Sequence, residues 1–488
     1  MNEEPLDLST VTPDPACILA VPPSLALRRL ALPLCVLNGE LVIAMADLAD
    51  TQTIEAIARA GGHPVQPRRA ETAQLREYLL RFYGDSRPRA TADTAAEDPV
   101  ALVDHLLRTA LLRHASDIHF DPEQDSLRVR FRVDGELEEI RRIPAAMQPS
   151  VTSRLKVLAG LDIAERRAAQ DGAFTWRMQG MYAGRIPPLD IRMATLPVRH
   201  GERITLRLLE HSGERLTLDR LGLSDSDLAN FERVLSKPHG LVLLTGPTGS
   251  GKTTTLYAAI QLLLAKRPLN ILTVEDPVEY EIPGVSQAEV DSADKVNFSK
   301  ALRSLLRHDP DVIMIGEIRD SESLDTAVKA ALTGHLVLST LHTNDAISAV
   351  TRLTDMGLAS HLAAATLRLS VAQRLVRALC PHCRQPYSLT AEEAVSLGHP
   401  DWTGKTFYRP GGCLRCAGRG FKGRIGIFEF FQPDRTLASR IATGAHESEL
   451  YAYEREQGMK TLLDDAMEKC LEGKTAVSEI QQLIGGGF

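Results

Sequence analysis

The chain has 488 residues, of which 44% are hydrophobic and 24% are charged, and its formal net charge is −7. This length predicts several domains rather than one core, and the composition excludes a disordered chain. No apolar run approaches the roughly 20 residues of a membrane-spanning helix, and the negative charge disfavours a protein that coats nucleic acid. The acidic start at Glu3 and Glu4 does not resemble a secretory signal, so we expect a cytoplasmic protein.

Residues 1–83 are expected to form a small α/β domain. Two apolar runs joined by the turn dipeptide Asn38-Gly39 predict a β-hairpin, and helical patterns follow it at 53–60 and 72–82. The stretch carries no catalytic constellation, so we interpret it as an N-terminal docking domain. Residues 84–98, which are poor in apolar side chains, are expected to form an exposed linker.

Residues 99–213 are expected to form a second domain built on an antiparallel sheet. Its predicted strands include 127–133, 190–196 and 204–209. In the first of them arginines alternate with apolar residues, a pattern typical of a solvated face and equally compatible with phosphate contact.

Arg192 and Arg207 each interrupt an apolar run of this second domain. A buried guanidinium is costly unless an anion or a carboxylate meets it. Two alternatives stay open at this point: contact with an anionic ligand, or ion pairs with acids such as Glu202 or Glu210.

The third domain, residues 214–488, contains the most informative motif. An apolar run that starts at Leu241 leads into G-x-x-x-x-G-K-T and then into a helical pattern, which is the arrangement of a phosphate-binding loop. We expect Lys252 to reach the β- and γ-phosphates of ATP and the Thr253 hydroxyl to ligate Mg²⁺. The expected nucleotide-binding residues are Gly246, Pro247, Thr248, Gly249, Ser250, Gly251, Lys252, Thr253 and Thr254.

Two later apolar runs end in acids, the first at Glu275 and the second at Glu317. Functional groups gather at the carboxyl ends of strands in open α/β sheets, so both acids are candidates to position and deprotonate an attacking water. Gly316, and not the usual aspartate, precedes Glu317. We therefore expect Mg²⁺ to rest on Thr253, the phosphates and water, with Glu317 contributing only indirectly.

His335 and His342 stand at either end of another apolar run, 336–341. A single histidine beside apolar residues is usually a satisfied core group. Two histidines that flank a strand expected beside the phosphate loop favour a role in sensing the γ-phosphate.

Four of the seven cysteines form two C-x-x-C pairs, Cys380 with Cys383 and Cys413 with Cys416. Two such pairs predict a closed, tetrahedral and therefore structural Zn²⁺ site. The other three cysteines are scattered. We expect a zinc-binding subdomain at residues 379–426, inserted into the third domain.

These motifs together resemble those of the type II/IV secretion and pilus-assembly ATPase superfamily. The segments similar to its Walker A, Asp box, Walker B and His box motifs are 246–253, 273–279, 309–320 and 335–345. Further similar segments are 115–119, 170–172, 373–377 and the two cysteine pairs. The resemblance covers residues 99–488 and implies an α/β fold, with a RecA-like motor domain and its zinc-binding insertion preceded by a PAS-like α+β domain and the small docking domain.

Within that superfamily the cysteine pairs are similar to those of type II secretion (GspE family) and pilus-extension ATPases. Only about 98 residues precede Pro99, which favours the type II secretion form. The resemblance implies a homohexamer on the cytoplasmic face of the inner membrane that powers pseudopilus assembly and export of folded proteins. It also implies that Arg192 and Arg207 contact the phosphates of ATP.

The implied partners are two platform proteins. Residues 1–83 would bind the cytoplasmic domain of an inner-membrane secretion platform protein (GspL-like), and the motor would act on a polytopic platform protein (GspF-like). The alternatives are a type IV pilus assembly ATPase, a nucleic-acid motor and a nucleotide-gated scaffold. An aromatic content of 5% disfavours nucleic-acid binding, and the presence of Lys252, Glu275 and Glu317 disfavours a scaffold.

Overall fold

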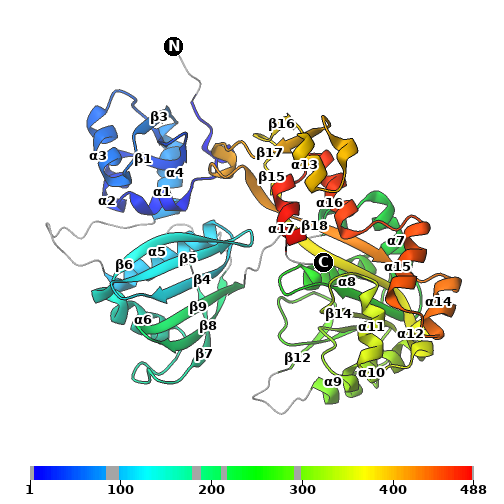
Figure 1. Cartoon of the computed structure of the whole chain (residues 1–488). Coiled ribbons are helices and arrows are strands. Elements are labelled where there is room, and N and C mark those ends of the chain that lie inside the picture. Colours follow the sequence, from blue (N-terminus) through cyan, green and yellow to red (C-terminus); the bar gives the residue numbers. More distant parts are fainter. Residues whose placement is uncertain (1–4, 84–97, 178–187, 210–216, 291–297, 486–488) are drawn as a thin grey trace. The chain divides into compact units, whose positions relative to one another are not determined.

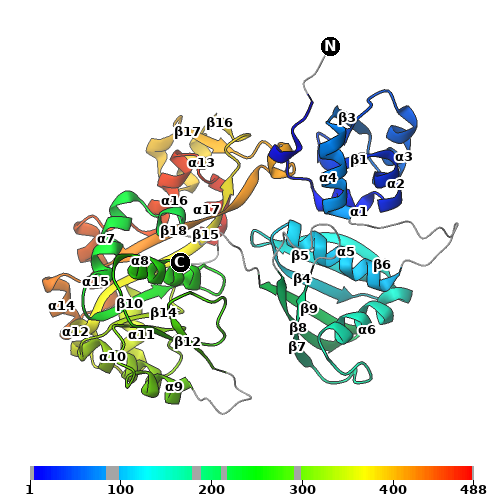
Figure 2. The same ribbon diagram turned by 180° about the vertical axis from the view of Figure 1, so that it is seen from behind.

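The computed structural model describes residues 5–83, 98–177, 188–209, 217–290 and 298–485 (Figures 1 and 2). It contains two compact units. The first comprises Met1–Ser212, Cys380–Gln385 and Pro410–Lys422, and the second comprises Gly213–Leu379, Pro386–Arg409 and Gly423–Phe488. Apart from Asp98, the predicted linker at 84–98 lies outside the described residues. Among the described helices, none combines the length and the apolar character that crossing a bilayer would require.

The N-terminal part of the first unit is a three-stranded sheet packed against helices. β1 (Ala31–Leu37) and β2 (Glu40–Met45) form the predicted antiparallel hairpin, and β3 (Val65–Arg69) pairs with β2 in parallel. Asn38 and Gly39 take the left-handed conformations that such a tight turn needs, with φ of 51° and 84°. The helices are α1 (Pro15–Ala20), α2 (Pro23–Arg29), α3 (Thr51–Gly61) and α4 (Thr72–Tyr83).

A six-stranded antiparallel sheet forms the second part of the first unit, as the alternating patterns predict. The strands, in the spatial order β6-β5-β4-β9-β8-β7, are β4 (Ala115–Pro122), β5 (Ser126–Val133), β6 (Glu136–Pro144), β7 (Gln170–Trp176), β8 (Leu189–Val198) and β9 (Gly201–Leu209). α5 (Pro99–Leu112) and α6 (Gln148–Leu158) cover its apolar face. β8 and β9 are longer than expected, so only Arg199 and His200 connect them.

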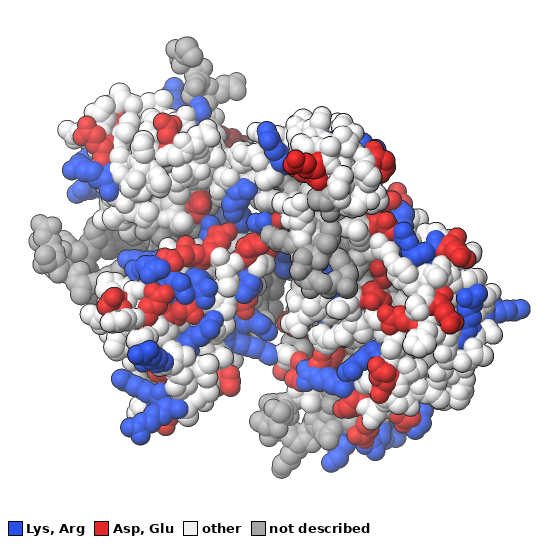
Figure 3. Space-filling view, in the orientation of Figure 1, with Lys and Arg blue, Asp and Glu red and all other residues white. Residues whose placement is uncertain are grey.

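The opposite face of this sheet is a ladder of ion pairs. Acids on β4 stand between arginines of β5 and β9: Asp117 lies 3.8 Å from Arg132 and 3.3 Å from Arg207, and Asp121 lies 2.8 Å from Arg130 and 3.1 Å from Arg203. Acidic and basic side chains are accordingly intermingled on the surface of this domain (Figure 3).

This arrangement corrects the expectation that Arg207 is buried among apolar neighbours, whereas Arg192 is partly buried. Side chains alternate along a strand, so the apolar residues around Arg207 point into the core while its own side chain points out and is 67% exposed. The acid that Arg207 meets is Asp117, whereas Glu202 is paired with the buried Lys156.

The second unit is a RecA-like α/β fold with a seven-stranded sheet, in the spatial order β12-β11-β13-β14-β10-β15-β18. The strands are β10 (Gly240–Thr245), β11 (Ile271–Glu275), β12 (Ser286–Glu289), β13 (Val312–Ile315), β14 (Leu336–Leu341), β15 (Leu367–Leu379) and β18 (Phe421–Phe431). The pairs from β12 to β15 are parallel, so their carboxyl ends share one edge of the sheet.

Helices pack on both faces of this sheet, which explains why its strands are continuously apolar. α7 (Asp225–Leu235) and α8 (Lys252–Lys266) cover one face. The other helices of the unit are α9 (Phe298–Leu305), α10 (Ser321–Leu332), α11 (Ser348–Asp355), α12 (Ser360–Thr366), α13 (Ala391–Ser396), α14 (Arg435–Ala442), α15 (Glu447–Glu456), α16 (Leu462–Leu471) and α17 (Val477–Gly485).

The segment inserted between β15 and β18 is divided between the two units. Its middle, with β16 (Gln385–Ser388), α13 and β17 (Thr406–Arg409), buries Leu389 and Phe407 in the core of the second unit. The two cysteine-bearing loops belong to the first unit. There Leu414 packs against the N-terminal core, and the carbonyl of Leu414 accepts a hydrogen bond of 2.9 Å from the N–H of Thr12.

Candidate nucleotide site and metal centre

The phosphate loop connects β10 to α8 at the carboxyl edge of the sheet. Gly246, Gly249 and Gly251 have φ of 142°, 82° and 87°, which only glycine adopts easily. A Cβ on Gly246 would lie 2.5 Å from the carbonyl oxygen of Gln373, and one on Gly251 would lie 2.8 Å from its Nε2. The loop is therefore tightly packed against β15, and its glycines allow the backbone to approach a ligand closely.

Lys252 is the first residue of α8 and is only 8% exposed. Its Nζ donates to the carbonyl oxygens of Gly246, at 2.8 Å, and Pro247, at 3.0 Å. Burial, and then the positive charge of Arg374, lower the pKa of Lys252 to about 8. Within the described part of the chain, no carboxylate pairs with Lys252 and the buried Oγ of Ser250 has no hydrogen-bond partner. An under-compensated cation and a free hydroxyl fit a polyphosphate ligand.

Glu317 and His342 lie together beside this loop. Glu317 follows β13, His342 follows β14, and their Oε2 and Nε2 atoms are 3.1 Å apart. Arg319 forms an ion pair with Glu317 and also contacts Asp276, at 3.2 Å. Burial, then the positive charges of Lys252 and Arg319, lower the pKa of His342, so it is neutral at pH 7.

Glu275 reaches the same edge of the sheet at the end of β11, but its carboxylate is engaged by neighbouring side chains. It is 2% exposed and accepts hydrogen bonds from the hydroxyl of Thr273, at 2.6 Å, from Nε2 of Gln287, at 3.1 Å, and from the hydroxyl of Tyr257. Glu317, at 22% exposure, is the acid with more access to a water molecule.

The structure separates the two candidate histidines. β14 runs parallel to β10, with Leu341 opposite Thr245 and Leu336 opposite Gly240. His342 consequently stands at the phosphate-loop edge, whereas His335 stands at the other edge, about 20 Å away by the usual rise per strand residue. The ring of His335 is hydrogen-bonded there to the carbonyl of Ala330, at 3.0 Å.

Sequence reasoning missed several residues that complete the site. Tyr257 holds Glu275, and Gln373 accepts a hydrogen bond of 2.8 Å from the hydroxyl of Thr255 on α8. Arg374 approaches the start of the phosphate loop and donates to the carbonyl of Asn344, at 2.7 Å. Gln373 and Arg374 belong to the segment 373–377 that carried part of the family resemblance, so a signal was present, but no role was assigned to them.

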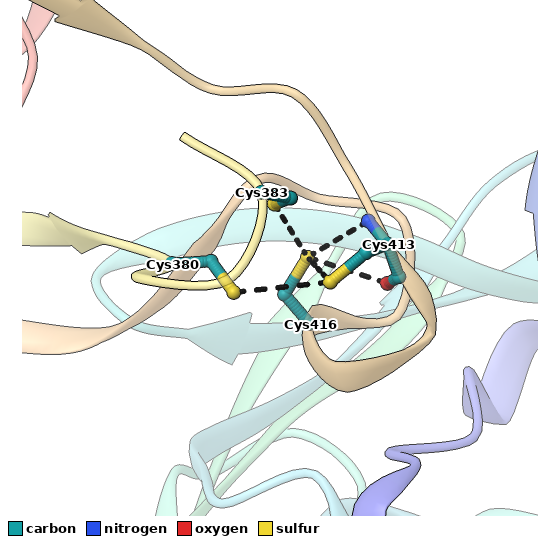
Figure 4. Close-up of side chains that lie close together, drawn as sticks. All are labelled: Cys380, Cys383, Cys413 and Cys416. Atoms are coloured by element: carbon teal, nitrogen blue, oxygen red, sulfur yellow. Dashed lines mark hydrogen bonds between the residues drawn. The ribbon is translucent and has the colours of Figure 1, made fainter. Parts of the chain in front are cut away.

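The four paired cysteines meet in one cluster (Figure 4). Their Sγ atoms all lie within 4.8 Å of one another, with separations of 3.9 Å for Cys380–Cys413 and 3.8 Å for both Cys383–Cys416 and Cys413–Cys416. Four sulfurs bound to Zn²⁺ at about 2.3 Å in a tetrahedron would be about 3.8 Å apart. The N–H groups of Cys413 and Gly420 also donate to the Sγ of Cys416, which stabilises a thiolate there. The cluster therefore fits Zn²⁺.

A parallel sheet with a phosphate loop after one strand and acids at the ends of two others, β11 and β13, defines a P-loop ATPase. The sequence profile of the family described as "Type II/IV secretion system protein" matches residues 93–482, and the chain belongs to this family of ATPases. The profile described as "MshEN domain" matches residues 2–89.

Individual relatives agree with this assignment. The chain is 45% identical to type II secretion system protein E of Pseudomonas aeruginosa, over 78% of this chain and 74% of that protein. It is 42% identical to type II secretion system ATPase E of Vibrio cholerae, over 79% of this chain and 75% of that protein. It is 38% identical to the type IV pilus assembly ATPase PilB of Myxococcus xanthus, over 97% of this chain and 88% of that protein.

Solved structures show the same fold. The pilus retraction motor PilT with bound ADP matches with a TM-score of 0.52 and 25% identity, over 78% of this chain and 96% of that one. The ATPase DotB of Legionella pneumophila matches with a TM-score of 0.59 and 22% identity, over 81% and 98%.

Proposed function

We propose that this ATPase is the motor of a type II secretion system and powers pseudopilus assembly and the export of folded proteins across the outer membrane. The sequence identities carry this proposal, because they are 42–45% with type II secretion proteins E and 38% with the pilus ATPase of Myxococcus xanthus. That pilus ATPase matches 97% of this chain, so type IV pilus assembly is the second candidate.

In the proposed site, Lys252 and the loop N–H groups hold the β- and γ-phosphates, and the Thr253 hydroxyl ligates Mg²⁺. When bound, the metal neutralises charge on the phosphates. Glu317 accepts the proton of the attacking water, Glu275 supports it from the next strand, and the neutral ring of His342 orients Glu317. His335 has no part in this assignment, because it stands at the other edge of the sheet.

The proposed working form is a homohexamer at the cytoplasmic face of the inner membrane. Residues 1–83 would bind the cytoplasmic domain of the GspL-like platform protein, and the motor would act on the GspF-like polytopic platform protein. Arg192 and Arg207, directly opposite each other on β8 and β9, would contact the phosphates of ATP during part of the cycle. The four cysteines would hold one structural Zn²⁺.

Deletion of the gene in the source organism separates the two systems. Loss of proteins from the culture medium with pili intact is the expected result, and it should be reversed by the wild-type chain but not by Lys252→Ala. Loss of pili with secretion intact would assign the chain to pilus assembly. ATPase rates with and without single-stranded DNA test the nucleic-acid motor, for which DNA would have to accelerate turnover.

A further inference from the structure

Arg374 is a cation placed against the phosphate loop. It lies on β15, two residues beyond Ala372, which is the last residue of that strand to pair with β10. A Cβ on Gly246 would stand 3.0 Å from its Nη1, so the guanidinium lies against the first residue of the loop. Nothing in the sequence pattern of the phosphate loop itself requires a cation at this place.

The partners of Arg374 are main-chain carbonyls only. Nη2 donates to the carbonyl oxygen of Asn344, at 2.7 Å, and Nη1 donates to that of Gln373, at 3.1 Å. Within the described residues no carboxylate forms an ion pair with it, although Glu429 and Asp345 act on it from farther away. Three residues along the same strand, Arg377 is held by both carboxylate oxygens of Glu479, at 2.6 and 3.0 Å.

Arg374 and Lys252 therefore form a pair of like charges that no adjacent carboxylate neutralises. Both side chains are at least half-buried, both donate only to carbonyl oxygens, and the charge of Arg374 is one of the two causes that lower the pKa of Lys252. Two cations in a shielded position repel each other unless an anion joins them. The planar guanidinium presents several donors in a fork, which suits phosphate oxygens.

We propose that Arg374 binds the phosphate chain of ATP together with Lys252 of the same subunit, as a second cationic ligand of the β- and γ-phosphates. This inference rests on the ATP site described above. ATP would then hold Arg374 between its phosphates and the carbonyl of Asn344, in the segment that leads from His342 to α11. The number of phosphates on the nucleotide would therefore affect the position of that segment through Arg374.

The test compares nucleotides of different phosphate length on the full chain, by displacement of a fluorescent ADP analogue. Arg374→Gln is the principal variant, because its amide N–H can still donate to the Asn344 carbonyl while the charge is lost. We expect ATP affinity to fall at least tenfold, ADP affinity to fall less, and AMP affinity to stay within twofold. Arg374→Lys should recover part of the ATP affinity.

Arg368→Ala is the matched control. Arg368 lies on the same strand, is also partly buried and also donates to a carbonyl, that of Ala365 at 2.8 Å, but it packs against Gly240 at the opposite edge of the sheet. Its affinities for all three nucleotides should match the wild type. Unchanged ATP affinity in folded Arg374→Gln, or an equal loss for ATP and AMP, would overturn the proposal, since a purely structural role has no preference for phosphate number. ATP binding by the wild type and by Arg368→Ala separates this outcome from failure of the site as a whole.

Discussion

Glu317 and His342 follow adjacent parallel strands, and their side chains meet at 3.1 Å beside the phosphate loop. Because the pKa of His342 is lowered by its burial and by nearby cations, its ring is neutral at pH 7 and orients Glu317 without neutralising it. Glu317 is thus a carboxylate held in one direction at the edge of the sheet where β10 leads into the phosphate loop and where β11 ends in Glu275. Because of this geometry, substitution of Glu317 is the first test of the proposed site.

Glu317→Gln should bind ATP with an affinity within twofold of the wild type and hydrolyse it at least about 100-fold more slowly. The amide keeps a hydrogen-bonding group beside His342 but cannot accept the proton of water. Steady-state turnover and nucleotide titration give the two quantities. Glu322→Gln is the control. Glu322 is an exposed acid that pairs with Arg303 on the adjoining helix, and its replacement should leave binding and turnover as in the wild type. Normal turnover of Glu317→Gln would rule out its proposed role.

ATP affinity should decline as the pH rises above about 8. The pKa of Lys252 is about 8 in the free protein, and the phosphates of bound ATP would raise it. Above pH 8 binding must take up a proton, so affinity should fall by up to about tenfold per pH unit. Calorimetry in buffers of different ionisation enthalpy measures both the affinity and the proton uptake.

Lys252→Arg supplies the comparison for this pH dependence. A guanidinium stays charged across the whole range, so its ATP affinity, although weaker, should be flat from pH 7 to about 9.5. Equal slopes in the wild type and in Lys252→Arg would show that another group is responsible.

Arg207→Ala should lose most of its turnover while changing the free energy of unfolding by less than about 1 kcal/mol. The guanidinium of Arg207 is 67% exposed, and Asp117 would still have Arg132 nearby, so loss of this ion pair should change stability little. Arg203→Ala removes an arginine from the same face of the same strand, where it pairs with Asp121 at 3.1 Å, and should keep its turnover. If both variants hydrolyse ATP equally well, Arg207 has only the structural role.

Elemental analysis of the purified chain should find about one zinc per chain, as four thiolates require. Replacing Cys380 and Cys413 together by serine removes one ligand from each pair and should abolish binding, whereas replacing the isolated Cys470 should not. The loss of metal should also loosen the loops that carry Leu414 and Gly420. A full complement of zinc in the double variant would refute the site.

Local motifs made the centre of the fold predictable. The spacing of Gly246, Gly251 and Lys252 defines a loop that is built from consecutive residues, and the short apolar runs around it are typical of buried parallel strands. The acids at the ends of those strands could be placed at one edge for the same reason. The hydrogen bond from Tyr257 to Glu275 could not be predicted, because it depends on how α8 packs over β11.

The expectation that the Arg207 side chain is buried was wrong for a different reason. Ile204, Leu206 and Leu208 alternate with Thr205 and Arg207, so the period of two already placed the arginine on the outer face. Its partner, Asp117, lies 90 residues earlier, and only the register of β4 against β9 brings the two together. The positions of His335 and His342 also depend on how strands pair. Because β14 runs parallel to β10, only His342 stands at the edge of the sheet that carries the phosphate loop.

The division of the cysteine segment has a practical consequence for dissecting the protein. The chain passes from one compact unit to the other after Ser212, Leu379, Gln385, Arg409 and Lys422, so no single proteolytic cut can release either unit as an intact fragment. A truncated chain that starts at Gly213 retains both cysteine loops but lacks the apolar core that covers Leu414. Such a fragment would expose apolar surface that is covered in the full chain. Its aggregation would therefore not show that the ATPase domain itself is unstable.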